Sequence, residues 1–259
     1  VNKVLFIGVF TPNSTNVAQA RAFEQLGWQV VAYDYRDRFD SLGIVKMRDN
    51  ELIEICTKEK PDLTIFSKCN NMHYRVVDEC NRHSKTVLWY MDALNNFDIE
   101  LVEKVKRVDS FICGIDGVVE HGKAHNPNSI FLPQCPDEEM NFMMRETAYD
   151  HDVTFIGNIS PHTGTHSDRL TYKNKVGFTH LEGVFGLEHN KAVNRSKINL
   201  NFAHKGYSDL PMHPRNAYTS SIKRFVPGTD FLHTNYRRKE ITRRVLDRAY
   251  EVGRPSLGW

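Results

Sequence analysis

At 259 residues the chain is long enough for one large or two moderate domains, and 40% hydrophobic with 25% charged residues is ordinary for a soluble globular protein. A formal net charge of +2 is too small to indicate nucleic acid or an anionic membrane as the main partner, because long-range steering needs a concentrated field of one sign. Five cysteines without a CxxC pair favour neither a disulfide framework nor a cysteine zinc cluster, and they fit a reducing cytoplasm. The apolar N-terminal stretch is too short to span a bilayer and predicts a first strand.

The first half of the chain alternates apolar, β-branched runs with helical patterns. We predict strands over 4–10, 29–35, 63–67, 86–91, 110–113 and 129–132. Between them we predict helices over 16–26, 50–60, 74–83 and 99–105, and a helical turn over 117–123. Continuous apolar strands separated by helices indicate a parallel sheet covered on both faces, with right-handed crossovers.

The second half opens a new strand and helix series. The predicted strand over 153–158 precedes a polar loop and a helix, followed by short strand character over 178–185 and a helix over 187–195. The stretch over 194–204 alternates as a strand, and we place it centrally, with its two amides near the ligand end and His204 at the rim. We therefore expect two doubly wound domains, over 1–137 and 153–259, joined by a linker over 138–152.

Polar residues at the carboxyl ends of the predicted strands are the candidate functional residues, because open parallel sheets bind ligands there. Asp92 follows an apolar strand directly, where a general base could sit, although a helix cap is an equally good interpretation. Asn13 is also a helix-cap candidate, and Lys68 also fits a solvated loop. Two sets of strand ends in two domains predict a cleft between them.

Motifs for metals and common cofactors are weak or absent. His121 and His125 have the i, i+4 spacing of metal ligands, as do His162 and His166, but glycine interrupts both segments, and solvated histidines explain them better. The DxD at 150–152 precedes its strand and is better interpreted as a charged linker. No GxGxxG, P-loop, GxSxG or HExxH motif is present, which removes the main support for dehydrogenase and P-loop kinase interpretations. The basic run over 237–248 fits a solvated helix face, with nucleic-acid contact as the weaker alternative.

Taken in order, several segments resemble glycosyltransferases of the GT-B class, in particular the group related to spore maturation protein CgeB and the family 1-like and 4-like enzymes. The matching pieces are KVLFIGVF, TVLWYMDA, DSFICGIDGVVEHGK, SIFLPQCPDEE, DVTFIGNIS, NKAVNRSKINLNFAH and LHTNYRRKEI. The resemblance spans nearly the whole chain. It implies an N-terminal acceptor domain, a C-terminal sugar-nucleotide domain and a reaction in the cleft between them.

The resemblance also implies site residues for transfer of a sugar from a nucleoside diphosphate sugar to an unknown acceptor. Asp92 and His204 would be catalytic, and Gly8, Asn13 and Lys68 would line the acceptor side of the cleft. The donor-binding candidates are Gly157, Asn158, Lys197 and Arg215. Neither a metal nor a further cofactor is required if cations neutralise the leaving diphosphate. The acceptor could be a glycan, a protein or a modified nucleic acid, in the cytoplasm.

A rival interpretation comes from the residues after Arg215. The family has an acidic, ribose-binding residue there, whereas this chain continues with Asn216, Ala217 and Tyr218. Too few residues separate Arg215 from His233 for the βα units that a nucleotide-binding domain normally holds there, so either the second domain is shortened or residues are missing between these positions. The alternative is thus a non-catalytic relative that binds a glycan or nucleic acid, and a sugar-nucleotide epimerase of the same shape is a third possibility.

Overall fold

The computed structural model describes residues 1–92, 97–144, 148–159 and 167–201. Within these residues the chain forms two compact units, the first over 1–134 and the second over 135–201. Each unit has its own parallel sheet, and each is described by itself. The predicted α/β class, with two units built on parallel sheets and a smaller second unit, is confirmed.

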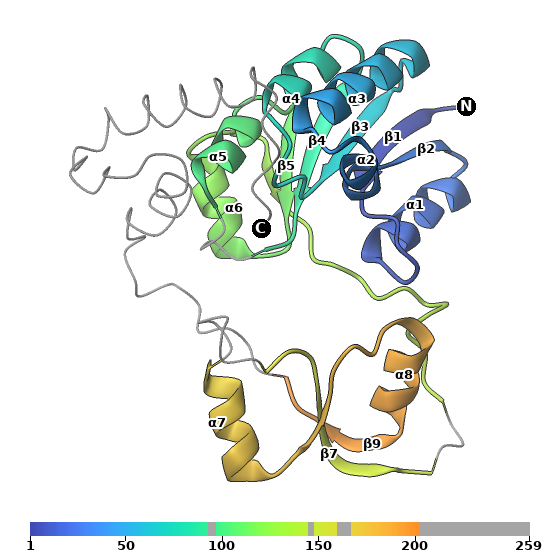
Figure 1. Cartoon of the computed structure of the whole chain (residues 1–259), viewed down its shortest axis with the longest axis vertical. Coiled ribbons are helices and arrows are strands. Elements are labelled where there is room, and N and C mark those ends of the chain that lie inside the picture. The colour runs from blue at the N-terminus through green and yellow to red at the C-terminus, as the bar shows by residue number, and fades with distance from the viewer. Residues whose placement is uncertain (93–96, 145–147, 160–166, 202–259) are drawn as a thin grey trace, which may run out of the picture. The chain divides into compact units, whose positions relative to one another are not determined.

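The first unit alternates strands and helices along the chain. Its strands are β1 (Lys3–Gly8), β2 (Gln29–Asp34), β3 (Leu63–Ser67), β4 (Lys85–Tyr90), β5 (Ser110–Cys113) and β6 (Ser129–Phe131). Its helices are α1 (Thr15–Gln25), α2 (Tyr35–Leu42), α3 (Val45–Glu59), α4 (Arg75–Cys80), α5 (Ile99–Val105) and α6 (Asp116–Lys123). The strand order is β2-β1-β3-β4-β5-β6, all parallel, and most of these strands can be followed side by side in Figure 1. The order reverses direction at β1, as in a doubly wound sheet.

Apolar side chains on the two faces of this sheet pack against different helices. On one face Val4, Phe6 and Ile65 pack with Phe23 of α1 and with Trp28. On the other face a larger cluster joins the strands to α3, α4, α5 and α6. Because the strands are covered on both sides, they read as continuous apolar runs, and each fully buried Val, Leu, Ile or Phe contributes about 1.5–3 kcal/mol.

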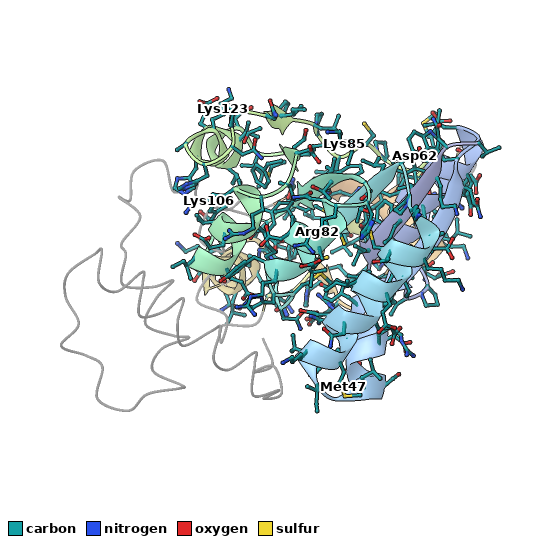
Figure 2. The ribbon with its side chains drawn as sticks, turned by 90° about the horizontal axis from the view of Figure 1, so that it is seen from above. Met47, Asp62, Arg82, Lys85, Lys106 and Lys123 are labelled. Atoms are coloured by element: carbon teal, nitrogen blue, oxygen red, sulfur yellow. The ribbon has the colours of Figure 1, made fainter. Side chains whose placement is uncertain are left out.

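Polar contacts join neighbouring segments at the amino ends of the strands. Asp62, directly before β3, accepts the backbone N–H of Lys3 at 2.7 Å, and Lys85 at the start of β4 pairs with Asp109 at 3.2 Å (Figure 2). The opposite, carboxyl ends open into the loops that carry most of the predicted site residues of this unit.

The second unit has a smaller sheet, with the order β8-β7-β9 among the described residues. Its elements are β7 (His151–Ile156), α7 (Ser167–Val176), β8 (Thr179–Leu181), α8 (Gly186–Asn194) and β9 (Ser196–Asn199). All pairings are parallel, and β7 lies in the middle. This order is the beginning of a doubly wound sheet.

Several details of the predicted elements differ from the structure; for example, the strand predicted over 178–185 is the shorter β8, and the helix predicted over 74–83 is the shorter α4. The structure adds helix α2, whose start is capped by Asp34 through the N–H groups of Arg36 and Asp37. Helix α3 begins at Val45, after Ile44 at its N-cap, instead of at residue 50. Of the strand predicted over 194–204, the described residues form β9 over Ser196–Asn199, since α8 extends to Asn194, and residues 202–204 lie outside the described part of the chain. Its expected core residue Ile198 is 55% exposed, and among the described strands β9 pairs only with β7. The structure does not describe the residues from 202 onward, so the central position of this strand stays a prediction. None of the described helices is both long and apolar enough to cross a bilayer.

Candidate functional site at the strand ends

A buried asparagine organises the carboxyl end of β1. Asn16 on α1 accepts the N–H of Val9 at 2.8 Å, and its amide donates to the hydroxyl of Ser67, at the end of β3, at 2.7 Å. Gly8 makes this approach possible, because a Cβ at that position would lie 2.5 Å from Asn16 Oδ1. The structure thus gives the predicted cleft residue Gly8 a role in close packing below the strand ends.

The loop after β1 is shaped by two further polar contacts. The Ser14 hydroxyl donates to the carbonyl of Val9 at 2.6 Å, and Ser14 is the N-cap residue of α1 without a side-chain capping bond. Asn13 is exposed and adopts a left-handed backbone with φ 67°, which asparagine tolerates better than most residues. The structure therefore leaves the Asn13 side chain at the surface of this loop.

Both oxygens of the carboxylate that ends β2 accept hydrogen bonds from the chain itself. One oxygen of Asp34 accepts the N–H groups of Arg36 and Asp37, and the other accepts the N–H of Phe10 at 2.6 Å. In dinucleotide-binding sheets an acidic residue after the second strand binds ribose. Here the hydrogen bonds of Asp34 hold the β1 loop to α2.

The ends of β3 and β4 bring two predicted site residues together. Lys68 Nζ lies 2.6 Å from Asp92 Oδ1, and both side chains are partly exposed, at 34% and 25%. The Lys68 N–H donates to the carbonyl of Trp89 at 3.0 Å, which fixes the backbone at the point where the two strands end. The pair thus places a cation and a carboxylate side by side at the open end of the sheet.

Below this pair lies a phenol without a hydrogen-bond partner among the described residues. Tyr90, the last residue of β4, is fully buried, and Phe97 and Phe111 pack around its ring with centroids at 6.1 and 6.4 Å. Burial raises the pKa of the Tyr90 hydroxyl, and the nearby charges of Asp92 and Asp98 raise it further. The phenol therefore stays protonated at neutral pH and remains available as a donor.

The chemistry open to this group of side chains is proton transfer with charge compensation. A carboxylate can take a proton from a hydroxyl, and the neighbouring ammonium places a positive charge beside it. Sequence reasoning placed Lys68 and Asp92 at strand ends and missed Asn16 and Tyr90. The signal for Tyr90 is its position at the end of a strand, two residues before Asp92.

The second unit has its own strand-end loop after β7. Gly157 has φ 146°, a region that favours glycine, and a Cβ there would lie 3.1 Å from the Phe155 ring. The Gly157 carbonyl lies 2.6 Å from His180 Nε2 on β8, so this nitrogen carries the proton and donates. The His180 ring stacks on Phe155 with an interplanar angle of 16°.

A cation from α7 reaches the same loop. Arg169 Nη1 donates to the carbonyl of Asn158 at 2.8 Å, and its guanidinium lies over the Phe155 ring at 5.2 Å from the centroid. An arginine beside a glycine loop at the end of a parallel strand has the chemistry to hold a phosphate, since its planar fork offers several donors. Sequence reasoning identified Gly157 and Asn158 and missed Arg169 and His180.

Lys197 does not lie with these residues. It is level with Asp152 in the β7–β9 register and pairs with that carboxylate at 2.5 Å, near the amino end of both strands. Gly157 is five residues further along, about 16 Å at the usual rise of a strand. The remaining DxD carboxylate, Asp150, pairs with Arg195 at 2.7 Å, so both carboxylates tie β7 to the segment around β9.

The other predicted residues can be placed briefly. Asn199 donates to the carbonyl of Val193 at 3.0 Å, which is a local backbone contact. His121 meets the Phe97 ring edge-on, His125 stacks on it, and the centroids of the two imidazole rings are 5.4 Å apart. No group of three or more metal-binding side chains occurs in the described part of the chain. His162, His166, His204 and Arg215 lie outside the described residues.

Comparisons with known proteins complete this description. No family model and no curated protein matches the chain, so its resemblance to the CgeB-related group stays a prediction. Among solved structures, a Listeria monocytogenes protein assigned as a UDP-N-acetylglucosamine 2-epimerase is similar at 11% identity and a TM-score of 0.44, over 84% of this chain and 73% of that one. S. aureus MnaA, solved with UDP, is similar at 9% identity and a TM-score of 0.44 over the same shares. Identities this low transfer neither a ligand nor an activity.

Proposed function

We propose that the protein is a sugar-nucleotide enzyme that transfers a sugar from a nucleoside diphosphate donor to an acceptor hydroxyl. The observation that carries the proposal is the Lys68–Asp92 pair, 2.6 Å apart at the open end of a six-stranded parallel sheet. Sheets of this type bind their ligands at that end, and a carboxylate there can act on a hydroxyl.

The donor is assigned to the second unit. Arg169 and the Gly157 loop supply a cation and a close approach for a diphosphate, and His180 adds an imidazole that already donates to the loop. The arginine neutralises the charge that develops on the leaving diphosphate. It thereby takes the role that a metal ion could otherwise have. Lys197, paired with Asp152 at the other end of its strand, is not part of this donor site.

The acceptor is assigned to the first unit. Asp92 takes the proton of the acceptor hydroxyl as its oxygen attacks the anomeric carbon. The bond from that carbon to the diphosphate oxygen breaks, and the nucleoside diphosphate leaves with the electron pair. Lys68, 2.6 Å from Asp92, places a positive charge beside the base.

Binding of the donor is tested by titrating UDP, GDP and their hexose derivatives while following the melting temperature and the heat of binding. We expect saturable binding of one nucleotide class. Arg169→Ala should weaken it roughly 10- to 100-fold, as expected for loss of hydrogen bonds to a charged group. Lys175→Ala removes the same charge from an exposed position of α7 and is the matched control. No response to any donor at millimolar concentration would contradict the proposal.

Transfer is tested by incubating the protein with the donor that binds and with glycan, protein and nucleic-acid acceptors. Asp92→Asn should remove transfer and leave donor binding unchanged. Binding without any product would support the alternative of a non-catalytic binding protein. Conversion of the donor sugar without an acceptor would identify an epimerase, and either outcome would replace the transferase proposal.

A further inference from the structure

We propose that Lys104 is a positioning residue, which holds the loop after β3 so that Lys68 meets Asp92. The inference deepens the proposed function, because it concerns the side chains assigned to the acceptor site. It rests on the contacts of one fully buried ammonium group, which no part of the proposed reaction uses directly.

Lys104 lies on α5 and is 0% exposed. Its ammonium donates to three backbone carbonyls of the β3 loop: Cys69 at 2.6 Å, Met72 at 3.2 Å and Asn70 at 3.3 Å. A lysine ammonium has three N–H donors, so the loop satisfies all of them. Burial of an ammonium costs free energy unless its N–H groups are hydrogen-bonded in this way. Burial of Lys104 therefore favours the loop conformation that supplies these three carbonyls.

A second buried cation holds the middle of the same loop. Arg48 on α3 is also 0% exposed and donates to the Asn71 carbonyl at 2.9 Å and to the Asn71 side-chain oxygen at 3.2 Å. Its partner Asp49 accepts the N–H of His73 at 3.1 Å. Four consecutive carbonyls, from residue 69 to residue 72, thus bind a buried lysine or arginine from two different helices.

The first residues of the loop have a conformation that needs such support. Lys68 and Cys69 have φ 62° and 50°, both left-handed and neither glycine. A left-handed backbone is unfavourable for residues with a Cβ and persists where contacts with the surrounding structure hold it in place. The hydrogen bond from Lys104 to the Cys69 carbonyl is such a contact.

This backbone sets the direction of the Lys68 side chain. Lys68 is the first residue after β3, its N–H is bound to the Trp89 carbonyl, and its ammonium reaches Asp92 at 2.6 Å. If the Lys104 ammonium is removed, three carbonyls lose their donor and the two left-handed residues can relax. We then expect the Lys68–Asp92 pair to open while the sheet below it remains folded.

The experiment measures the pair without any substrate. Each lysine is acylated with limiting acetic anhydride in the full chain, and the rate at Lys68 is read by peptide mass spectrometry relative to that of the exposed Lys175 in the same sample, so that consumption of the reagent by an added amine cancels. In Lys104→Ala the Lys68 rate should rise about fivefold, which corresponds to loss of a partly exposed ion pair. Propylammonium, which replaces the missing chain and charge, should restore the slow rate, whereas propanol and tetramethylammonium should not. Lys106→Ala is the matched control, since Lys106 lies on the outer face of the unit and pairs with Glu103 at 2.8 Å (Figure 2).

An unchanged Lys68 rate in folded Lys104→Ala, or a raised rate that propylammonium does not lower, would overturn the proposal. If Lys104→Ala is unfolded, the same salts are compared for restoring its melting transition. Recovery of the fold together with Lys68 protection supports the proposal, and recovery of the fold alone contradicts it. Lys104→Met keeps the aliphatic volume and serves as a second variant; unfolding of both variants that no salt reverses would show a role in the whole fold instead. Since no nucleotide or acceptor is present, failure here is distinct from failure of the transferase proposal.

Discussion

The two units complete their strand ends in different ways. In the first, Asn16, Asp34, Arg48 and Lys104 are bound to loop backbone, and most of these groups are buried. In the second, Arg169 reaches its loop through an exposed contact to the Asn158 carbonyl. The difference indicates that buried groups fix the loops of the first unit, whereas a contact open to solvent holds the loop of the second.

Two ion pairs show the same contrast in its simplest form. Arg48 and Asp49 lie 2.6 Å apart with both side chains 0% exposed, and Lys197 and Asp152 lie 2.5 Å apart with 57% and 82% exposed. The distances are nearly equal, so the two pairs differ in burial and in the further hydrogen bond that Asp49 accepts from the His73 N–H. Removing one partner of a buried pair leaves the other charge without water or a counter-charge. In the exposed pair, water solvates the charge that remains.

The largest effect is therefore expected for Asp49→Ala. The change leaves the Arg48 guanidinium without its counter-charge and the His73 N–H without its acceptor, and should cost about 3–5 kcal/mol of unfolding free energy. Urea unfolding measures it, with Asp152→Ala as the exposed control. Equal losses in the two variants would remove the distinction between the pairs.

A smaller loss is expected for Gly8→Ala. The new Cβ would meet Asn16 Oδ1 at 2.5 Å, so Asn16 must move and its bonds to Val9 and Ser67 weaken, at a cost of about 1–3 kcal/mol. Gly117→Ala is the control, because nothing lies within 4 Å of a Cβ there and α6 already has helical backbone at this residue. Thermal unfolding of Gly117→Ala should show no loss. A neutral Gly8→Ala would mean that Asn16 is not held as tightly as its contacts suggest.

Two glutamates on α5 should have opposite pH effects on stability. Burial raises the pKa of Glu100 to about 8, with Lys104 and Arg48 opposing and Asp98 and Asp49 adding to it. Burial also acts on Glu103, but hydrogen bonds from Lys106 and Arg107 outweigh it and lower its pKa.

A raised folded-state pKa means that the Glu100 contribution is present below its ordinary pKa of 4.5 and is lost as the pH rises through about 8. The lowered pKa of Glu103 gives a contribution that is present above its ordinary pKa and is lost as the pH falls through the folded-state value. Urea unfolding across this range should show that Glu100→Gln reduces the loss at alkaline pH and that Glu103→Gln reduces the loss at acid pH. The same sign in both variants would contradict the assignment.

The smallest effect is expected for Lys197→Ala. Its pair with Asp152 is exposed, so the melting temperature should not change measurably. Donor binding should not change either, in contrast to Arg169→Ala. Calorimetry with the nucleotide that binds decides this, and a loss equal to that of Arg169→Ala would return Lys197 to the donor site.

The fold was predictable where buried segments have a recognisable apolar pattern in the sequence. Strands β1, β3 and β4 are covered on both faces and so appear as continuous apolar runs, which sets their approximate bounds. Helix α2 was missed because YRDRFDSL has little apolar periodicity, and its start depends on a cap from Asp34. The pattern at β9 misled for a related reason: alternation predicts a buried face only where another layer covers it, and Ile198 is exposed.

The site was predictable only in part. The rule that ligands bind at strand ends placed Lys68, Asp92, Gly157 and Asn158 in suitable loops. It could not show that Lys68 and Asp92 pair, because that depends on the register of β3 and β4. Arg169, His180 and Lys104 were missed because each acts through contacts with residues distant in sequence, and nothing in their local sequence distinguishes them from surface residues.

The double use of Asp34 has a consequence for redesign of this sheet. Any attempt to introduce dinucleotide recognition after β2 would have to free a carboxylate whose two oxygens join the β1 loop to the start of α2. Replacing its neighbours with a glycine fingerprint would not be sufficient, because α2 would first need a new N-cap and Phe10 a new acceptor. Ligand choice at this corner is thus coupled to helix formation, and the two would have to be changed together.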